Sequence, residues 1–380
     1  MLSADGQTYS YKQVLELVIH AVSWLYADKA APKYVAIFGS RSVEACVGVL
    51  AAAWVGAAYV PINLKLPALA VADLLRRSGV DALICDRGGS SNLNNQILEH
   101  GPKKVLAVRG FVPKDAHPQV VWFEDLPPNP HISPPITAAA DAIACILHTS
   151  GSTGRPKGVM VPSSAVKHFL DEMETSYPLC RDDRVAETTE LSFDLSVYNM
   201  FSTWRAGACL HIIPKSQAPA PTKFIIDHSI TVWLSVPSIA ALMHRMGMLK
   251  PGSMRSLRYS FFRGRTASSE FGGSVASRCS IVGRRQFLRS DGGDSGLFGS
   301  RIQVARFLRA RLRRYRTAVR RNDSCGRTHS RNFSLRDTGR TMALRAATGS
   351  RLLERTRGDS SSFCECQRNT LVSNRRPRVS

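Results

Sequence analysis

Apolar residues recur at two different spacings along the first two-thirds of the chain. Between residues 8 and 30 they fall every three or four positions, as on one face of a helix, at Val14, Leu15, Val18, Ile19, Val22 and Leu25. Short unbroken apolar runs follow, and these are typical of buried strands, at Tyr34–Phe38, Ala58–Ile62 and Ala82–Cys85. The segments beside them favour helices, at Ser42–Val55 and Leu74–Ser78. Short strands alternating with helices predict an α/β fold of layered, largely parallel sheets.

A proline-containing stretch separates this region from a second one. Residues 113–138 hold several prolines and are expected to form a surface connection. Residues 142–148 and 158–161 then favour two strands, with a loop of small polar residues between them. A helix is predicted at 163–173, with Ser163 or Ser164 as its N-terminal cap.

The charge of the chain is unevenly distributed. The whole sequence has 51 Lys and Arg against 29 Asp and Glu, a formal net charge of +22. Residues 1–262 contain 24 basic and 21 acidic residues, whereas residues 263–380 contain 27 basic and 8 acidic ones. The first region is therefore nearly neutral, and its charge calls for neither a nucleic acid nor an anionic membrane as partner.

The cysteines and the apolar runs restrict the class of protein further. The nine cysteines lie singly, and none in residues 1–262 has the spacing of a metal or redox site. The longest apolar run, Val47–Ile62, is too short to span a membrane. The N-terminal residues have neither the basic start nor the apolar core of a signal peptide. These features predict a cytoplasmic protein with reduced thiols, no protein-bound metal and no membrane partner.

The loop between the two later strands is the strongest chemical signal. It contains Thr149, Ser150, Gly151, Ser152, Thr153, Gly154 and Lys157. The glycines let backbone N–H groups approach an anion, the hydroxyls add donors, and the lysine supplies a compact positive charge. The Gly-Lys-Ser/Thr ending of a Walker loop is absent. We therefore predict a polyphosphate site here, and a flexible Ser/Gly linker is the alternative.

Residues 147–159 resemble the signature loop of the adenylate-forming superfamily, which includes acyl-CoA synthetases, luciferases and adenylation domains of nonribosomal peptide synthetases. Gly56–Ile62 resembles an earlier motif of that family, with Asn63 where an Asp is usual, and Arg41–Glu44 also fits. The resemblance runs from about residue 7 to residue 262 and implies the large N-terminal domain of such an enzyme. It implies a reaction in which a carboxylate attacks the α-phosphate of ATP with Mg²⁺, giving an acyl-adenylate and pyrophosphate.

A second motif points to the acid that is activated. Leu191–Tyr198 resembles the Phe-Asp-x-Ser motif of amino-acid adenylation domains, and in that subgroup the aspartate pairs with the substrate's α-ammonium. Asp194 takes that position in an apolar stretch, where a buried carboxylate needs a cation. The alternative is that Asp194 caps a helix that begins near Ser196. The same resemblance implies a side-chain pocket lined by Leu195, Tyr198 and Leu234.

The family pattern stops at Phe262, and so does the use of lysine. Residues 1–262 use 12 Lys and 12 Arg, whereas residues 263–380 use 27 Arg and no Lys. Arginine codons are plentiful where GC-rich DNA is read out of frame. Codons can be chosen for residues 286–299 that, read one base later, encode N-F-Y-G-P-T-E-A-T-V-A-F-S. This peptide is the superfamily's adenine-side motif. The same shift after Phe262 permits G-D-A-L-P, the continuation that the family pattern leads us to expect.

We therefore interpret residues 1–262 as the N-terminal portion of an adenylation domain and residues 263–380 as an out-of-frame, disordered tail without a specified fold. The alternatives are an Arg-rich arm that binds RNA or DNA and an inert truncated fragment. Because the chain lacks the in-frame adenine motif, the later motifs and the C-terminal domain of the family, we expect it to be inactive as given.

The parent activity that this interpretation implies is ATP-dependent activation of a carboxylic acid, an amino acid in the first place, with release of pyrophosphate. The expected cofactors are ATP and Mg²⁺, and a carrier-protein thiol is the expected acceptor. An acyl- or aryl-CoA synthetase-like activity is the alternative, and it would dispense with the ammonium contact at Asp194.

Overall fold

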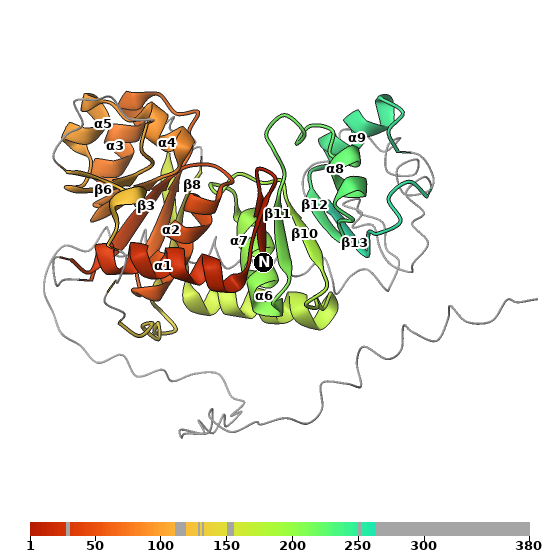
Figure 1. The fold of residues 1–380 in the computed structure, drawn as a ribbon, viewed down its shortest axis with the longest axis horizontal. Coiled ribbons are helices and arrows are strands. Elements are labelled where there is room, and N and C mark those ends of the chain that lie inside the picture. Colours follow the sequence, from red (N-terminus) through yellow and green to blue (C-terminus); the bar gives the residue numbers. More distant parts are fainter. Residues whose placement is uncertain are drawn as a thin grey trace, which may run out of the picture. The chain divides into compact units, whose positions relative to one another are not determined.

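The computed structural model describes residues 1–27, 31–110, 119–127, 130, 133–149, 156–249 and 252–262. Within these residues the chain forms two mainly parallel sheets with helices between and beside them, the predicted α/β fold (Figure 1). The predicted tail, residues 263–380, lies outside the described residues, and so do Ser150–Arg155 of the predicted phosphate loop.

The first sheet contains most of the N-terminal strands. Its order is β7 (Val120–Trp122), β6 (Lys104–Ala107), β5 (Ala82–Cys85), β3 (Tyr34–Phe38), β4 (Ala58–Ile62), β8 (Ile143–Thr149) and β9 (Lys157–Pro162). Neighbouring strands run parallel, except that β8 and β9 pair antiparallel. The helices that follow its strands are α2 (Val43–Trp54), α3 (Ala68–Ser78), α4 (Arg87–Asn92) and α5 (Asn95–His100).

The second sheet combines the chain start with later strands. Its order is β13 (Tyr259–Phe262), β12 (Val232–Ser235), β10 (Arg184–Glu187), β11 (Cys209–Ile212), β1 (Leu2–Ala4) and β2 (Gln7–Tyr9). Only β1 and β2 pair antiparallel in this sheet. The remaining helices are α1 (Tyr11–Leu25), α6 (Ser163–Ser176), α7 (Asp194–Ala206), α8 (Thr222–Asp227) and α9 (Pro237–Arg245).

The largest apolar core unites α1, α2 and strands of both sheets. Helix α2 is apolar on most sides, as expected for a helix that is covered by neighbours rather than by water. Gly48 allows its close approach to the first sheet, because a Cβ at this position would lie 2.8 Å from Cδ1 of Ile37 on β3. The central position of α2 therefore depends on a residue with no side chain.

Several local predictions are confirmed and some are wrong. The strands at Tyr34–Phe38, Ala58–Ile62 and Ala82–Cys85 have the predicted bounds. Helix α6 begins at Ser163 as predicted, but its cap is Pro162, with no side-chain hydrogen bond, so the predicted serine cap is wrong. The stretch predicted as a surface connection contains β7 and a 3-10 turn at Phe123–Asp125. This edge strand has three residues, too few for a clear alternation of apolar and polar positions.

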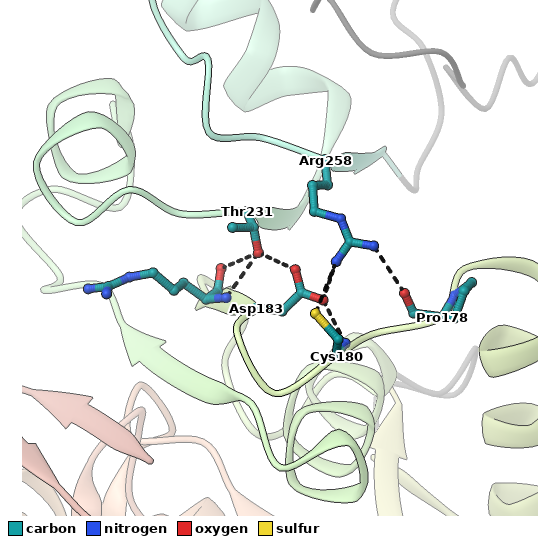
Figure 2. Close-up of polar contacts among 6 residues, drawn as sticks. Pro178, Cys180, Asp183, Thr231 and Arg258 are labelled. Atoms are coloured by element: carbon teal, nitrogen blue, oxygen red, sulfur yellow. Dashed lines mark hydrogen bonds and ion pairs between the residues drawn. The ribbon is translucent and has the colours of Figure 1, made fainter. Parts of the chain in front are cut away.

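A polar cluster around Asp183 joins three strands at the N-terminal edge of the second sheet, because β10, β12 and β13 all begin beside it (Figure 2). Asp183 is 1% exposed. Its Oδ2 accepts from Arg258 and from the Cys180 N–H, and its Oδ1 accepts from the Thr231 hydroxyl. That hydroxyl in turn accepts from the N–H of Arg184 at 2.9 Å. Both oxygens of this buried carboxylate are therefore satisfied, as such a group requires.

Candidate functional site

At the opposite, carboxyl edge of the second sheet, the chain leaves the parallel strands. Strand β10 ends at Glu187 and β12 at Ser235, so the segments after them leave from the carboxyl edge of parallel strands. The segment after β10 leads directly into the N-terminus of α7. In open α/β sheets, ligands bind outside the carboxyl ends of the strands. Residues 187–195 and 234–236 therefore form the candidate site.

The predicted phosphate loop is bracketed by paired strands. Thr149 is the last residue of β8 and Lys157 the first of β9, and the two lie opposite each other in the antiparallel register. The Thr149 hydroxyl donates to the Lys157 carbonyl at 3.5 Å. The side chain of Lys157 is exposed. The intervening Ser150, Gly151, Ser152, Thr153 and Gly154 lie outside the described residues, so their predicted phosphate contacts remain a prediction.

Asp194 lies at the surface rather than in the apolar interior that the sequence suggested. It is exposed and is the first residue of α7, whose cap is Phe193 without a side-chain hydrogen bond. The prediction of a buried carboxylate is therefore wrong, and so is the alternative of a cap for a helix starting near Ser196. The residue before Asp194 carries an exposed phenyl ring, 56% accessible. A carboxylate in the first turn of a helix is favoured by the helix dipole.

The three residues predicted to line the acid pocket lie in one apolar cluster. Tyr198 and Leu234 are buried in it, and the partly buried Leu195 packs against it. The Tyr198 ring meets Phe169 and Phe261 edge-on, with centroids 6.1 Å and 5.8 Å away. Burial raises the pKa of Tyr198 well above its usual range, so its hydroxyl stays protonated at neutral pH. Among the described residues this hydroxyl has no hydrogen-bond partner.

Arg41 is a polar residue of the site to which the sequence patterns assigned no role. Its buried guanidinium donates to the Thr188 carbonyl and lies 3.8 Å from Oε1 of Glu190. The Thr188 hydroxyl donates to the Leu234 carbonyl at 2.7 Å. Arg41 thus ties the first sheet's β3–α2 connection to the segment after β10. The resemblance at Arg41–Glu44 was the signal that marked this connection, but it named no partner.

Glu187 was not singled out from the sequence. It ends β10, directly after the apolar Val185 and Ala186, and is 2% exposed. Its Oε1 accepts from the Thr189 N–H at 2.7 Å and from the Asn199 amide at 3.1 Å. Burial raises the pKa of Glu187 to about 8, against the smaller opposing effects of these two hydrogen bonds and of Arg41. An acidic residue directly after two apolar ones is the sequence signal for this group.

The described residues contain no group of three or more His, Cys, Asp or Glu side chains that could hold a metal ion. This part of the chain offers no all-protein cage for Mg²⁺, which is in any case commonly held by substrate phosphates together with one or two carboxylates. In the same residues no helix is long and apolar enough to cross a membrane.

Comparison with known proteins identifies the family. Residues 1–287, three-quarters of the chain, match the family of AMP-binding enzymes. The chain is 33% identical over 235 residues to pyochelin synthetase PchF of Pseudomonas aeruginosa, covering 61% of this chain and 12% of that protein. It is 31% identical over 232 residues to an L-proline--[L-prolyl-carrier protein] ligase of Streptomyces coelicolor, covering 59% of this chain and 43% of the ligase.

Solved structures agree with this assignment. The Vibrio cholerae adenylation domain AlmE, in complex with glycyl-adenosine-5'-phosphate, has a TM-score of 0.65 and 26% identity. That match covers 75% of this chain and 55% of AlmE. IdnL7 gives a TM-score of 0.64 with 29% identity, covering 73% of this chain and 55% of that one.

The chain belongs to the family of AMP-binding enzymes, adenylate-forming acid–AMP ligases that use ATP. It aligns with less than half the length of the curated relatives named above. The fold is that of the N-terminal domain of these enzymes, as the sequence predicted.

Proposed function

We propose that this chain derives from an enzyme that activates an amino acid with Mg²⁺–ATP. A carboxylate oxygen of the amino acid attacks the α-phosphorus, the bond to the oxygen bridging to the β-phosphorus breaks, and pyrophosphate leaves. The observation that carries the proposal is the placement of Asp194 in the first turn of α7, at the carboxyl edge of the second sheet. Relatives that include a prolyl-carrier protein ligase support an amino acid as substrate and a carrier protein as acceptor.

The proposed roles follow from the chemistry of each group. Thr149, Lys157 and the loop between them bind the phosphates, and the ammonium of Lys157 stabilises the charge of the departing pyrophosphate. The carboxylate of Asp194 pairs with the α-ammonium of the substrate. Leu195, Tyr198 and Leu234 contact the substrate side chain. Mg²⁺ enters with ATP, bound to its phosphates.

An ATP–pyrophosphate exchange assay with a panel of amino acids tests the proposal, carried out with the frame-corrected enzyme, in which the reading frame is restored after codon 262. Lys157→Ala should lower exchange by about 100-fold, because one charge-assisted contact to the developing charge is lost. The exposure of Lys157 predicts that folding is unaffected. Lys167→Ala is the matched control, since Lys167 is an exposed residue of α6 that pairs with Asp171. Equal exchange by Lys157→Ala and wild type would contradict the phosphate assignment.

The ammonium contact has its own test. If Asp194 binds the α-ammonium, the enzyme should prefer an amino acid to the matching des-amino acid, and Asp194→Ala should reduce that preference by about tenfold. Asp227→Ala is the control, because Asp227 is a surface residue of α8 paired with Lys223. Equal use of both acids by the wild type would instead favour an acyl- or aryl-CoA synthetase-like activity.

The domain boundary is also part of the proposal. We propose that the adenylation domain ends at Phe262 and that residues 263–380 are translated out of frame, which leaves this chain inactive. The support is the change in composition: 27 Arg and no Lys beyond that residue. Sequencing the DNA around codon 262 tests it. The proposal is contradicted if the DNA after codon 262, read one base later, does not encode the two family motifs. Exchange activity of the 380-residue chain would also contradict it.

A further inference from the structure

Two buried polar atoms beside the candidate site lack partners. Within the described residues, Oε2 of Glu187 and Oδ1 of Asn199 accept no hydrogen bond, although both are shielded from water. The two side chains already share one contact, because the Asn199 amide donates to Oε1 of Glu187 at 3.1 Å. Both residues are deeply buried, with Glu187 2% and Asn199 0% exposed. Burying an unsatisfied acceptor is unfavourable, and a buried unpaired carboxylate is more so.

A single proton would satisfy both atoms. A protonated carboxyl group donates through one oxygen and accepts through the other, and a primary amide does the same through its oxygen and nitrogen. Face to face, an acid and an amide form a cyclic pair with two hydrogen bonds. The existing contact supplies the amide-to-acid half of this pair. A proton on Oε2 supplies the acid-to-amide half.

The charged and titratable groups around Glu187 fit this arrangement. Arg41, from the connection before α2, is directed to the Thr188 carbonyl and Glu190. Glu190, on the same segment as Glu187, adds negative charge and works against ionisation. Cys46 on α2 is buried, which raises the pKa of its thiol far above the usual range, so it contributes no charge. No residue among those described forms an ion pair with Glu187 within 4.0 Å.

We propose that Glu187 is a positioning residue: its protonated carboxyl closes a cyclic acid–amide pair with Asn199 and, through Oε1, holds the Thr189 N–H. These contacts fix both ends of the short segment that follows β10. Thr189 lies near the start of this segment, and Asn199 lies in the second turn of α7, the helix into which the segment leads. The segment between them carries Phe193 and Asp194. The pair therefore fixes the orientation of the carboxylate to which the proposed function assigns the substrate ammonium, and this functional role rests on that proposal.

Stability as a function of pH tests the protonation without any substrate. The pKa of about 8 in the folded protein exceeds the usual value of 4.5 for a glutamate. The stability gained from the proton is therefore complete below pH 4.5 and is lost as the pH rises through about 8. The unfolding constant of the full chain should rise by up to about tenfold per pH unit across this window. In Glu187→Gln, which keeps the paired geometry without a titrating proton, this component should be absent.

Glu190→Gln is the matched control and should keep the pH-dependent component, because Glu190 lies outside the acid–amide pair. Infrared spectra give a direct second measurement. At pH 7 the wild type and Glu190→Gln should show a protonated-carboxyl band that is missing in Glu187→Gln and fades in the wild type near pH 8. The same band and the same pH dependence in Glu187→Gln would overturn the proposal. If Glu187→Gln does not fold, the band must still fade near pH 8 in the wild type.

The functional role has a separate readout. In the exchange assay with the frame-corrected enzyme, the KM for the amino acid should rise above pH 8, whereas its kcat and the KM of its Glu187→Gln variant should change less. An equal rise of KM in both proteins would overturn the positioning role. If the frame-corrected enzyme supports no exchange but the infrared band behaves as expected, the proposed function fails and the acid–amide pair stands.

Discussion

Strand β10 has a buried acidic side chain at each end, and the two are satisfied in different ways. Asp183, just before the strand, has hydrogen bonds to both oxygens and an ion pair with Arg258 (Figure 2). Glu187, the last residue, has both of its hydrogen bonds on one oxygen and no ion pair among the described residues. Both oxygens of Asp183 therefore have donors, whereas Oε2 of Glu187 has none among the described residues, and burial favours the neutral form of Glu187. The cluster at the N-terminal edge of the sheet thus stabilises the fold, whereas the carboxyl edge contains Glu187, whose protonation can change with pH.

The largest effect on stability is expected at the N-terminal edge. Asp183→Ala leaves Arg258 without its ion-pair partner and removes the carboxylate that accepts from Thr231 and Cys180. We expect the free energy of unfolding to fall by about 3 kcal/mol, at the low end for a buried pair because Arg258 is partly exposed. Urea unfolding measures the change. A loss below about 1 kcal/mol would contradict the structural role of the cluster.

The second prediction addresses the carboxyl edge. Asn199→Asp places a second carboxyl group against Glu187, and two such groups share one proton because both cannot ionise together at low cost. Stability should therefore fall more steeply with rising pH than in the wild type. Each additional proton contributes about 1.4 kcal/mol per pH unit. Unfolding midpoints at several pH values measure this, with Asp183→Asn as the comparison at the other end of β10. Parallel curves for Asn199→Asp and wild type would contradict the prediction.

The third prediction returns to the Asp183 cluster. Thr231→Val removes the hydroxyl that donates to Asp183 and accepts from the Arg184 N–H while keeping the shape of the side chain. We expect a loss of about 1.5 kcal/mol, since two buried polar groups lose one partner each. Thr231→Ser keeps the hydroxyl and should retain most of the stability. Equal destabilisation by both substitutions would indicate that packing, rather than hydrogen bonding, is what matters at this position.

The parts of the molecule that could be predicted from the sequence are those that depend on residues close together in the chain. The strands at Tyr34–Phe38 and Ala82–Cys85 were predictable because each is a continuous apolar run, and burial on both faces requires that pattern. The bracketing of the phosphate loop by two strands was predictable for the same reason. These features depend on neighbours along the chain.

The polar clusters depend on residues far apart in the sequence, and this is why they were missed. Asp183 and Arg258 are separated by 75 positions, and no local pattern indicates that they pair. Asp194 was expected to be buried because its neighbours are apolar, but the helix begins at Asp194 itself and presents it to solvent. Glu187 and Asn199 are 12 positions apart on a strand and a helix, and their contact depends on how α7 packs against β10.

The smallest effect on stability is expected from the hydroxyl of Tyr198, which is buried and has no hydrogen-bond partner among the described residues. Tyr198→Phe removes a polar group whose burial is not offset by a bond, so the free energy of unfolding should change by less than about 0.5 kcal/mol. Tyr198→Leu is the control. It keeps an apolar side chain but loses the edge-on ring contacts with Phe169 and Phe261, and should cost more than about 1 kcal/mol.

The two readouts of Tyr198→Phe separate structure from function. Among the described residues the hydroxyl stabilises no part of the fold, so any change in the preferred acid must come from contact with the substrate. We expect the ranking of amino acids in the exchange assay of the frame-corrected enzyme to shift towards apolar side chains while the unfolding midpoint stays the same. A loss of more than about 1 kcal/mol in Tyr198→Phe would show that the hydroxyl has a partner in the protein. An unchanged ranking at unchanged stability would place it outside the acid pocket.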